Sequence, residues 1–521
     1  MTPARRYLVS WLAVAFALAQ VTLAQPPQAQ PPASVSAADV RSAADMLPAI
    51  TEEILGRSGV PGMSVVVVYN DEIVFLSGFG VREAGSDAPV TGDTVFQIAS
   101  LSKPVASTVV AALVGSGALE WDDQVADLLP GFRLGDPWLT SMVTVRDLFA
   151  HRSGIHGDAG NDLEILGYGR DEILERLRHA GPGAGFRDGY FYSNYGMTAG
   201  GVAAAAGAGL SWEEAARQYL YEPLGMSSSS SRHEDFVARQ NRASLHIPVA
   251  GEWRPELQRQ PDPQSPAGGV SSSARDMGAW LRLQLAQGSF EDEQVVAREA
   301  LLETHEPHIF QGFHPITGSG TFYGLGWNVS SDEQGRVRLA HAGAFSVGAR
   351  SYASLIPQER LGIIVLANAF PTGAPEAVAD SFIDLVDHGE LTRDWLAEWD
   401  VLYDALWGSF TAGAGAYAQP PEAAAPPLEQ AAYKGVYGND YFGEARVEAS
   451  DENLTLYLGP DGATSYELSH WNRDTFIYYP SAELPELPSG ATFTIGPDGV
   501  ATSLYLEEWD SHGQGTFVRE R

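Results

Sequence analysis

The 521-residue chain contains no cysteine. Disulfide bonds, thiolate metal sites, a cysteine nucleophile and a lipid-modified cysteine are therefore excluded. Lysine is almost as scarce, because Lys103 and Lys434 are the only two among 32 basic residues. Arginine stays charged in proteins, whereas lysine loses its proton when burial lowers its pKa. A lysine that acts as a base must therefore be one of these two.

Positive charge as a whole is in short supply. The formal net charge is −34, and so acidic a chain should repel nucleic acid and anionic lipid surfaces. The hydrophobic content of 44% is ample for large cores, which argues against disorder. Beyond the first residues no segment is long and apolar enough for a membrane span. We therefore expect neither a nucleic-acid partner nor stable membrane insertion of the mature protein.

Signatures of several other enzyme classes are missing. No Gly-x-Ser-x-Gly elbow occurs, which argues against an α/β-hydrolase. His305 and His308 lack a His-Glu-x-x-His pattern, so a zinc site is not predicted. No phosphate-cradling loop is found. The sequence therefore predicts neither a metal nor another cofactor.

The N-terminus has the layout of an export signal. Arg5 and Arg6 form a positive region, residues 7–19 are apolar, and residues 22–24 suit a cleavage site. An uncleaved anchor is the alternative, although the apolar run is short for a span. We predict a signal peptide over residues 1–24, a flexible tether over 25–39, and a periplasmic or secreted protein.

The rest of the chain divides into two predicted domains. In residues 40–410, strands come first, helices fill the middle and strands return, which predicts an α+β fold with a mostly antiparallel sheet. An Ala/Pro-rich linker is predicted over residues 411–430. Residues 431–521 alternate apolar and polar side chains and predict a small all-β barrel or sandwich. Its predicted strands include residues 445–449, 454–458, 475–479, 491–495 and 503–506.

The strongest chemical signal is Ser100 followed three positions later by Lys103. Pro104 is tolerated only in the first turn of a helix, so a helix is predicted to begin near residues 100–102. Side chains three apart on a helix are neighbours. A serine needs a nearby base to become a nucleophile, and a lysine of lowered pKa is such a base.

Two later stretches carry further candidates. Tyr192 and Asn194 lie in an aromatic, glycine-flanked loop, where a phenol beside a lysine can relay a proton and an amide can bind a substrate amide. His341 and Gly343 are predicted at the end of a strand, where glycine allows close backbone approach. Taken alone, each stretch is better explained by ordinary packing.

Together these stretches resemble the serine hydrolases of the class C β-lactamase and penicillin-binding-protein superfamily, whose motifs run Ser-x-x-Lys, Tyr-x-Asn and Lys/His-x-Gly. Residues 148–154, 266–269 and 323–327 look similar to accessory motifs of that superfamily. The resemblance covers roughly residues 40–390 and implies a β-lactamase/transpeptidase-like sheet with a helical subdomain. The C-terminal segment resembles the lipocalin-like β domain of some members.

The resemblance also implies a set of site residues. Ser100 would be the nucleophile, with Lys103 and Tyr192 handling protons and His341 completing the catalytic group. The backbone N–H groups of Ser100 and Ala344 would form the oxyanion hole.

The same resemblance implies the substrate-binding residues. Asn194 and Gly343 would bind the substrate, and His341 would help to orient it. The third motif has histidine where typical β-lactamases have lysine, and a mostly neutral histidine holds a carboxylate less firmly. Arg350 is a candidate for the missing positive charge.

Three functions remain open on the sequence. The first is an exported serine peptidase or amidase acting on small peptides that include D-residues. The second is an esterase or a class C-like β-lactamase. The third is a non-catalytic sensor of peptides or peptidoglycan, against which an intact set of Ser100, Lys103 and Tyr192 argues. The oligomeric state is not predicted.

Overall fold

A computed structural model describes residues 35–181, 183, 185–411, 417, 419, 421–450, 453–480, 487–511 and 513–520. The predicted signal peptide lies outside the described residues, as do most of the predicted tether and part of the predicted linker. Across the described ranges, no helix combines the length and apolar character that a membrane crossing requires.

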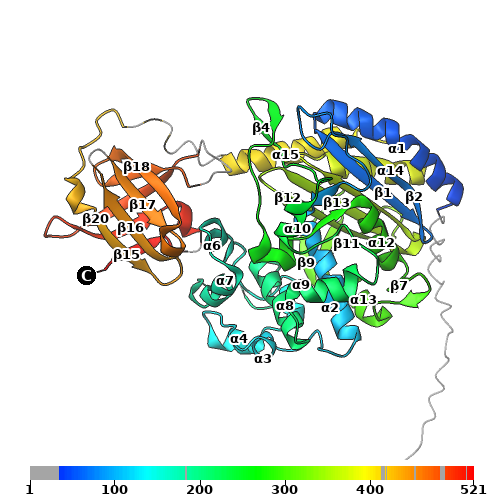
Figure 1. Ribbon diagram of the computed structural model, residues 1–521, viewed down its shortest axis with the longest axis horizontal. Helices are drawn as coiled ribbons and strands as arrows, with labels where there is room; N and C mark the ends of the chain where they lie inside the picture. Colours follow the sequence, from blue (N-terminus) through cyan, green and yellow to red (C-terminus); the bar gives the residue numbers. More distant parts are fainter. Residues whose placement is uncertain are drawn as a thin grey trace, which may run out of the picture. The chain divides into compact units, whose positions relative to one another are not determined.

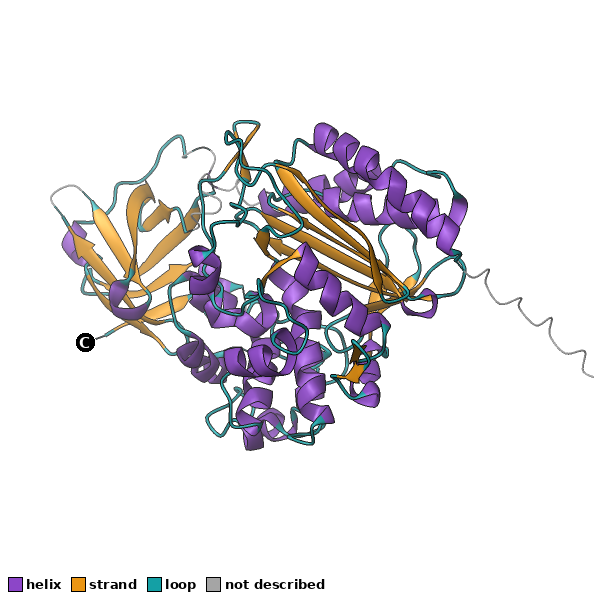
Figure 2. Ribbon diagram, turned by 45° about the vertical axis from the view of Figure 1, so that its right-hand side comes forward, coloured by secondary structure: helices purple, strands orange, loops and turns teal. Residues whose placement is uncertain are grey.

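Eight antiparallel strands form one sheet, in the order β2-β1-β14-β13-β12-β11-β10-β9. The predicted α+β class is confirmed, because helices lie on both faces of this antiparallel sheet (Figure 2). The strands are β1 (Gly62–Tyr69), β2 (Glu72–Gly80), β9 (Ile309–Phe313), β10 (Gly320–Tyr323), β11 (Asn328–Ser331), β12 (Val337–Phe345), β13 (Ala349–Ile356) and β14 (Leu361–Ala367).

The valine run of β1 shows how the sheet separates two cores. Successive side chains of a strand point to opposite faces. Val65 and Val67 pack in one hydrophobic cluster, and Val66 and Val68 pack in another on the other face. Because both faces of β1 are buried, its sequence is a continuous β-branched run and not an alternating one.

One face of the sheet is covered by α1 (Ala37–Ser58), α14 (Ala374–His388) and α15 (Trp395–Thr411), with α1 and α14 side by side (Figure 1). Ser36 and Asp39 form a capping box that starts α1 inside the predicted tether. The last residues of the predicted tether are therefore helical.

On the other face, α12 (Ala274–Leu285) packs against β1 and β14. Nearly every side chain of α2 (Ser102–Gly115) is buried. The remaining helices are α3 (Val125–Leu128), α4 (Pro137–Met142), α5 (Val145–Phe149), α6 (Asn161–Ile165), α7 (Arg170–Arg176), α8 (Asn194–Gly207), α9 (Trp212–Ala216), α10 (His233–Ala238), α11 (Ser265–Gly268) and α13 (Arg298–His305). The short strand pairs are β3 (Val95–Gln97) with β6 (Ser271–Ser273), β4 (Ile247–Val249) with β5 (Glu252–Arg254), and β7 (Ser289–Phe290) with β8 (Glu293–Gln294).

The C-terminal segment forms a closed eight-stranded barrel, which settles the choice between barrel and sandwich. All five predicted strands are present, and β15, β18 and β22 were not among them. The strands are β15 (Gly435–Asn439), β16 (Gly443–Ala449), β17 (Leu454–Leu458), β18 (Thr464–Asn472), β19 (Thr475–Tyr478), β20 (Ser489–Ile495), β21 (Ala501–Leu506) and β22 (Thr516–Arg519). Pairing of β15 with β22 closes the barrel.

Candidate active site

Ser100 sits in a tight turn just before α2. The turn is the 3-10 segment η1 (Ala99–Leu101), and α2 begins at Ser102, as the position of Pro104 predicts. Ala99 has a φ of 48°, a left-handed conformation that is uncommon for a residue other than glycine. Such backbone strain is typical of functional sites, where the surrounding structure holds the residue in place.

The ammonium or amine of Lys103 has three oxygen partners. Its Nζ lies 3.0 Å from Ser100 Oγ, 2.7 Å from Asn194 Oδ1 and 3.0 Å from the carbonyl oxygen of Ala267. The last two oxygens are acceptors only. A neutral amine has two N–H groups for them and one lone pair left for the hydroxyl proton of Ser100. The three N–H groups of an ammonium would fit the same three oxygens, so the distances suit both protonation states. Only the neutral form can act as a base toward Ser100.

Burial favours the same protonation state. Lys103 is fully buried, and this desolvation holds the pKa of its amine well below 10.5. No ion pair with a carboxylate is recorded for Lys103 within the described residues. A buried lysine without an opposite charge is most stable as the neutral base.

Tyr192 completes the contact with the nucleophile. Its hydroxyl donates to Ser100 Oγ at 2.8 Å, and Lys103 Nζ lies 4.5 Å from the centre of its ring. Burial raises the pKa of Tyr192 above 10, which outweighs the hydrogen bond to Ser100. Tyr192 is thus a proton donor in the resting site, and Lys103 is the group that can accept a proton.

Asn194 is the first residue of α8, whose N-terminal cap is the side chain of Ser193. The alanine- and glycine-rich sequence of α8 was not predicted as a helix. Asn194 Nδ2 donates to Asn161 Oδ1 at 3.2 Å, while Asn194 Oδ1 accepts from Lys103. Both ends of the amide are therefore engaged in fixing the lysine.

Gly343 lies two residues before the last residue of β12, close to the strand end at which it is predicted. A Cβ atom there would lie 2.2 Å from the carbonyl oxygen of Ile98, 2.5 Å from Ser351 Oγ and 2.8 Å from the nitrogen of Leu101. Only glycine lets β12 pack this closely against the turn that carries Ser100.

His341 is hydrogen-bonded through both of its ring nitrogens. Its Nδ1 lies 2.8 Å from the carbonyl oxygen of Ala342, so Nδ1 carries the proton, and its Nε2 accepts from the hydroxyl of Tyr323 at 2.9 Å. Burial, the nearby Lys103 and Arg350 lower the pKa of His341 to about 3. Both nitrogens of this neutral histidine are thus engaged within the protein, and its role in orienting a substrate stays a prediction.

Arg350 does not belong to this group. It is the register partner of Ala344 in β13, so its side chain lies on the sheet face opposite His341 and Gly343. There its guanidinium forms an ion pair with the buried Glu376 and stacks on the ring of Tyr403. The prediction that Arg350 binds the substrate is therefore wrong in this structure.

Three site residues were missed in the sequence: Asn161, His151 and Tyr323. His151 is buried, and its ring contacts the rings of Tyr192 and Tyr323 with centroids 4.6 and 4.8 Å apart. Its Nδ1 accepts from the backbone nitrogen of Ser193. Burial, Lys103 and His341 hold the pKa of His151 well below 6.5. The only signal for His151 and Tyr323 was their place in the accessory stretches, to which no role was given.

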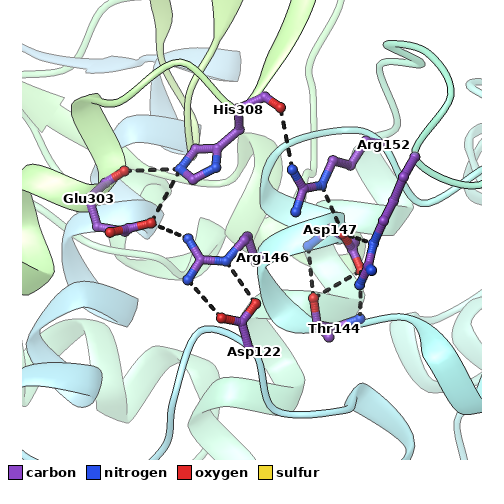
Figure 3. Close-up of polar contacts among 8 residues, drawn as sticks. Asp122, Thr144, Arg146, Asp147, Arg152, Glu303 and His308 are labelled. Carbon is purple, nitrogen blue, oxygen red and sulfur yellow. Dashed lines mark hydrogen bonds and ion pairs between the residues drawn. The ribbon is translucent and has the colours of Figure 1, made fainter. Parts of the chain in front are cut away.

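A polar network includes Arg152, the residue after His151, and Asp147 (Figure 3). The buried carboxylate of Asp147 accepts from Arg152 Nε at 2.8 Å, from Arg187 and from Thr144. Burial alone would raise the pKa of Asp147, but the hydrogen bonds from Arg187 and Arg152 keep that pKa below its usual value. Arg146 pairs with Asp122 and Glu303, and Glu303 in turn approaches His308.

Comparison with known proteins agrees with this arrangement. The family model described as Beta-lactamase matches residues 47–388, and one described as a domain of unknown function (DUF3471) matches residues 419–517. Penicillin-binding protein 4 of Amycolatopsis lactamdurans is 29% identical over 345 residues, which are 65% of this chain and 86% of that protein. Unguisins hydrolase ungD of Aspergillus violaceofuscus is 24% identical over 510 residues, which are 87% of this chain and 86% of that protein.

Solved structures share the fold over almost the whole chain. The octameric penicillin-binding protein homologue from Pyrococcus abyssi has a TM-score of 0.57 at 21% identity and covers 91% of this chain and 99% of its own. A crystal structure of SurE has a TM-score of 0.56 at 21% identity, with 93% of this chain and 100% of its own covered. SurE has also been solved with D-Leu, at a TM-score of 0.54.

Proposed function

We propose that this chain, which belongs to the beta-lactamase family of serine hydrolases and penicillin-binding proteins, cleaves amide or ester bonds of small peptides through an acyl-enzyme on Ser100. The observation that carries the proposal is the position of Ser100 Oγ. It lies between the buried amine of Lys103 at 3.0 Å and the hydroxyl of Tyr192 at 2.8 Å.

In the acylation step, Ser100 Oγ attacks the substrate carbonyl carbon as its proton passes to the neutral amine of Lys103. Collapse of the tetrahedral intermediate breaks the bond from carbon to the leaving nitrogen or oxygen. Tyr192 protonates that leaving group and regains a proton from Lys103. The ammonium that exists between these two proton transfers lies beside the ring of Tyr192, where a cation–π interaction stabilises it.

In the second step, water attacks the acyl carbonyl and gives up a proton to Lys103. The bond between Ser100 Oγ and the acyl carbon breaks, and the oxygen takes a proton back. Acid product leaves and the resting site is restored. One lysine thus serves both steps, because each step needs first a base and then an acid.

The proposed oxyanion hole consists of the backbone N–H groups of Ser100 and Ala344. Support comes from the contact of Gly343 with the turn at Ile98 and Leu101, which brings β12 beside Ser100. Support also comes from the end of β11, which pairs with β12 only up to Ala340. The backbone of β12 beyond Ala340 is therefore not covered by β11. Loss of one such donor typically lowers kcat about 10²-fold or more.

Peptides that contain a D-residue are the first substrates to test. The relative from Aspergillus violaceofuscus is named as a hydrolase, and one structural neighbour was solved with D-Leu. Histidine in place of lysine in the third motif also weakens the case for a dedicated β-lactamase, since His341 is neutral and engaged with Tyr323.

Covalent labelling tests the proposal. Purified wild-type protein, Ser100→Ala and Ser116→Ala would be incubated with a fluorescent fluorophosphonate and a fluorescent penicillin. Ser116 lies just beyond the other end of α2, and its hydroxyl bonds to the carbonyl of Leu113, so its variant is a matched serine control. We expect label on wild type and Ser116→Ala and none on Ser100→Ala.

A panel of D-amino-acid amides, L-amino-acid amides, p-nitrophenyl esters and nitrocefin, ranked by kcat/KM, would then separate amidase, esterase and β-lactamase activities. If wild-type protein has a native circular dichroism spectrum but is not labelled by the fluorophosphonate, the result favours the sensor function. Equal labelling of Ser100→Ala would place the nucleophile elsewhere.

Export belongs to the proposal and rests on the sequence of residues 1–24 alone. Cleavage after Ala24 predicts a mature protein that begins at Gln25. Intact-mass measurement on protein collected from outside the cytoplasm tests this. A chain that retains its first 24 residues would contradict it.

A further inference from the structure

The turn between β15 and β16 connects the barrel with the helical part of the catalytic domain. Asn439 fixes this turn, since its Oδ1 accepts from the backbone nitrogens of Tyr441 and Phe442 at 2.8 Å each. Gly443 follows with a φ of 82°, and a Cβ there would lie 2.8 Å from the hydroxyl of Tyr168. The turn is therefore built to approach the catalytic domain closely.

Tyr441 is fully buried at this contact. Its hydroxyl accepts from the backbone nitrogen of Gly160 at 2.7 Å and donates to Asp162 Oδ1 at 2.7 Å. Gly160 and Asp162 flank Asn161, so a single phenol bonds to the backbone on one side of this residue and to a side chain on the other. The carbonyl oxygen of Tyr441 also accepts from Arg176 in α7 at 3.0 Å.

Asn161 links this contact to the nucleophile. Its Oδ1 accepts from Asn194 Nδ2, and Asn194 Oδ1 accepts from Lys103. Gly160 adds a second link, because a Cβ atom there would lie 2.4 Å from the ring of Tyr195, the residue after Asn194. The start of α6 is therefore seated against the start of α8 on one side and against Tyr441 on the other.

We propose that Tyr441 of the barrel is a positioning residue of the active site, which holds Asn161 so that Asn194 orients the amine of Lys103. The barrel is then a structural component of the catalytic centre. This inference rests on the proposed hydrolase function. Tyr441 touches no reacting atom and acts only through Asn161 and Asn194.

The test compares three phenol-to-phenyl substitutions in the full-length protein. Tyr441→Phe removes the bonds to the backbone nitrogen of Gly160 and to the carboxylate of Asp162, on the two sides of Asn161. Tyr168→Phe removes another hydroxyl between the two domains, which donates to the carbonyl of Phe442 at 2.6 Å and does not reach Asn161. Tyr437→Phe removes a buried hydroxyl inside the barrel, which bonds to the carbonyl of Tyr433.

Two measurements are made on each variant: the second-order rate of fluorophosphonate labelling, and hydrogen exchange of residues 157–168 followed by mass spectrometry. We expect Tyr441→Phe to lower the labelling rate about tenfold, because small misplacements of catalytic groups have effects up to about 10²-fold. Exchange in residues 157–168 should become faster only in this variant. Where a turnover substrate is known, the loss should fall on kcat and leave KM within about twofold.

The outcomes separate this inference from the proposed function. If wild type does not label, the proposed hydrolase function is refuted. If wild type and Tyr441→Phe label at equal rates, only the positioning role of Tyr441 is overturned. Equal losses in Tyr441→Phe and Tyr168→Phe would also overturn it, since general docking of the barrel would then explain both. If Tyr441→Phe does not fold, Asn161→Ala tests the same link from the catalytic domain, and an unchanged labelling rate there refutes the inference.

Discussion

Substitution of Gly343 by alanine tests the reasoning about the Ser100 turn. The new Cβ would lie 2.2 Å from the carbonyl oxygen of Ile98 and 2.8 Å from the nitrogen of Leu101. Ordinary contact begins at about 3.4 Å, so β12 and the turn must separate by about 1 Å. Ser351 Oγ, at 2.5 Å, can move by rotation, but the two backbone atoms cannot.

A displacement of about 1 Å between catalytic groups lowers the rate about 10²-fold, which corresponds to about 2.7 kcal/mol of transition-state stabilisation. Overpacking of this kind also costs about 1–3 kcal/mol of unfolding free energy. We therefore expect Gly343→Ala to fold with reduced stability and to label with fluorophosphonate about 100-fold more slowly than wild type.

The matched control is Gly56→Ala, in the last turn of α1. A Cβ at Gly56 meets no atom within 4 Å, and alanine is the better helix former by up to about 1 kcal/mol. This variant should label at the wild-type rate and unfold at equal or higher urea concentration. Labelling of Gly343→Ala within threefold of wild type, at the same urea midpoint, would refute the close-packing argument.

The other predictions concern charge. The acidic limb of the pH profile of kcat/KM should have its midpoint well below 10.5, because burial lowers the pKa of Lys103. The profile should show no inflection near 6.5, because the pKa of His341 is lowered to about 3. Lys103→Arg should lower the labelling rate by about 10²–10⁴-fold with an unchanged circular dichroism spectrum, and full activity would remove the lysine from proton transfer. Arg350→Met should lower the unfolding free energy by about 3–5 kcal/mol in urea titrations, because it leaves Glu376 buried without its partner. The kcat/KM of this variant should stay within about threefold of wild type. Arg254, which forms an exposed ion pair with Glu252, offers the control. Arg254→Met should lower the unfolding free energy by less than about 1 kcal/mol.

Local pattern was enough to predict the elements that carry the nucleophile. Pro104 marked the start of α2, which begins at Ser102. Helix α8 escaped prediction because its run of alanine and glycine has no polar face, being buried almost throughout. A helix buried on all sides lacks the periodicity on which sequence reasoning depends.

The side chains of β12 and β13 escaped prediction for a different reason. Arg350 is seven residues from Gly343, and nothing in that spacing fixes which sheet face it occupies. The face depends on the register across the intervening turn, in which Ala344 pairs with Arg350 and Gly343 with Ser351. A shift by one residue would have placed the guanidinium beside Ser100. Register of this kind is set by tertiary packing, here by the pairing with Glu376 on α14.

The scarcity of lysine acquires a physical meaning in the structure. In the described part of the chain the recorded ion pairs use arginine or histidine as the cation, as Arg152 and Arg187 do around the buried Asp147. Arginine suits that work because it stays charged and bonds a carboxylate with two parallel N–H groups. Lys103 is buried without any carboxylate, so its environment removes the charge that those arginines keep. Arginine thus supplies cations for the structural ion pairs, and lysine supplies the proton acceptor. An arginine at position 103 would retain its positive charge, and a carboxylate beside Lys103 would restore the positive charge of the lysine. Either change would leave Ser100 without a base.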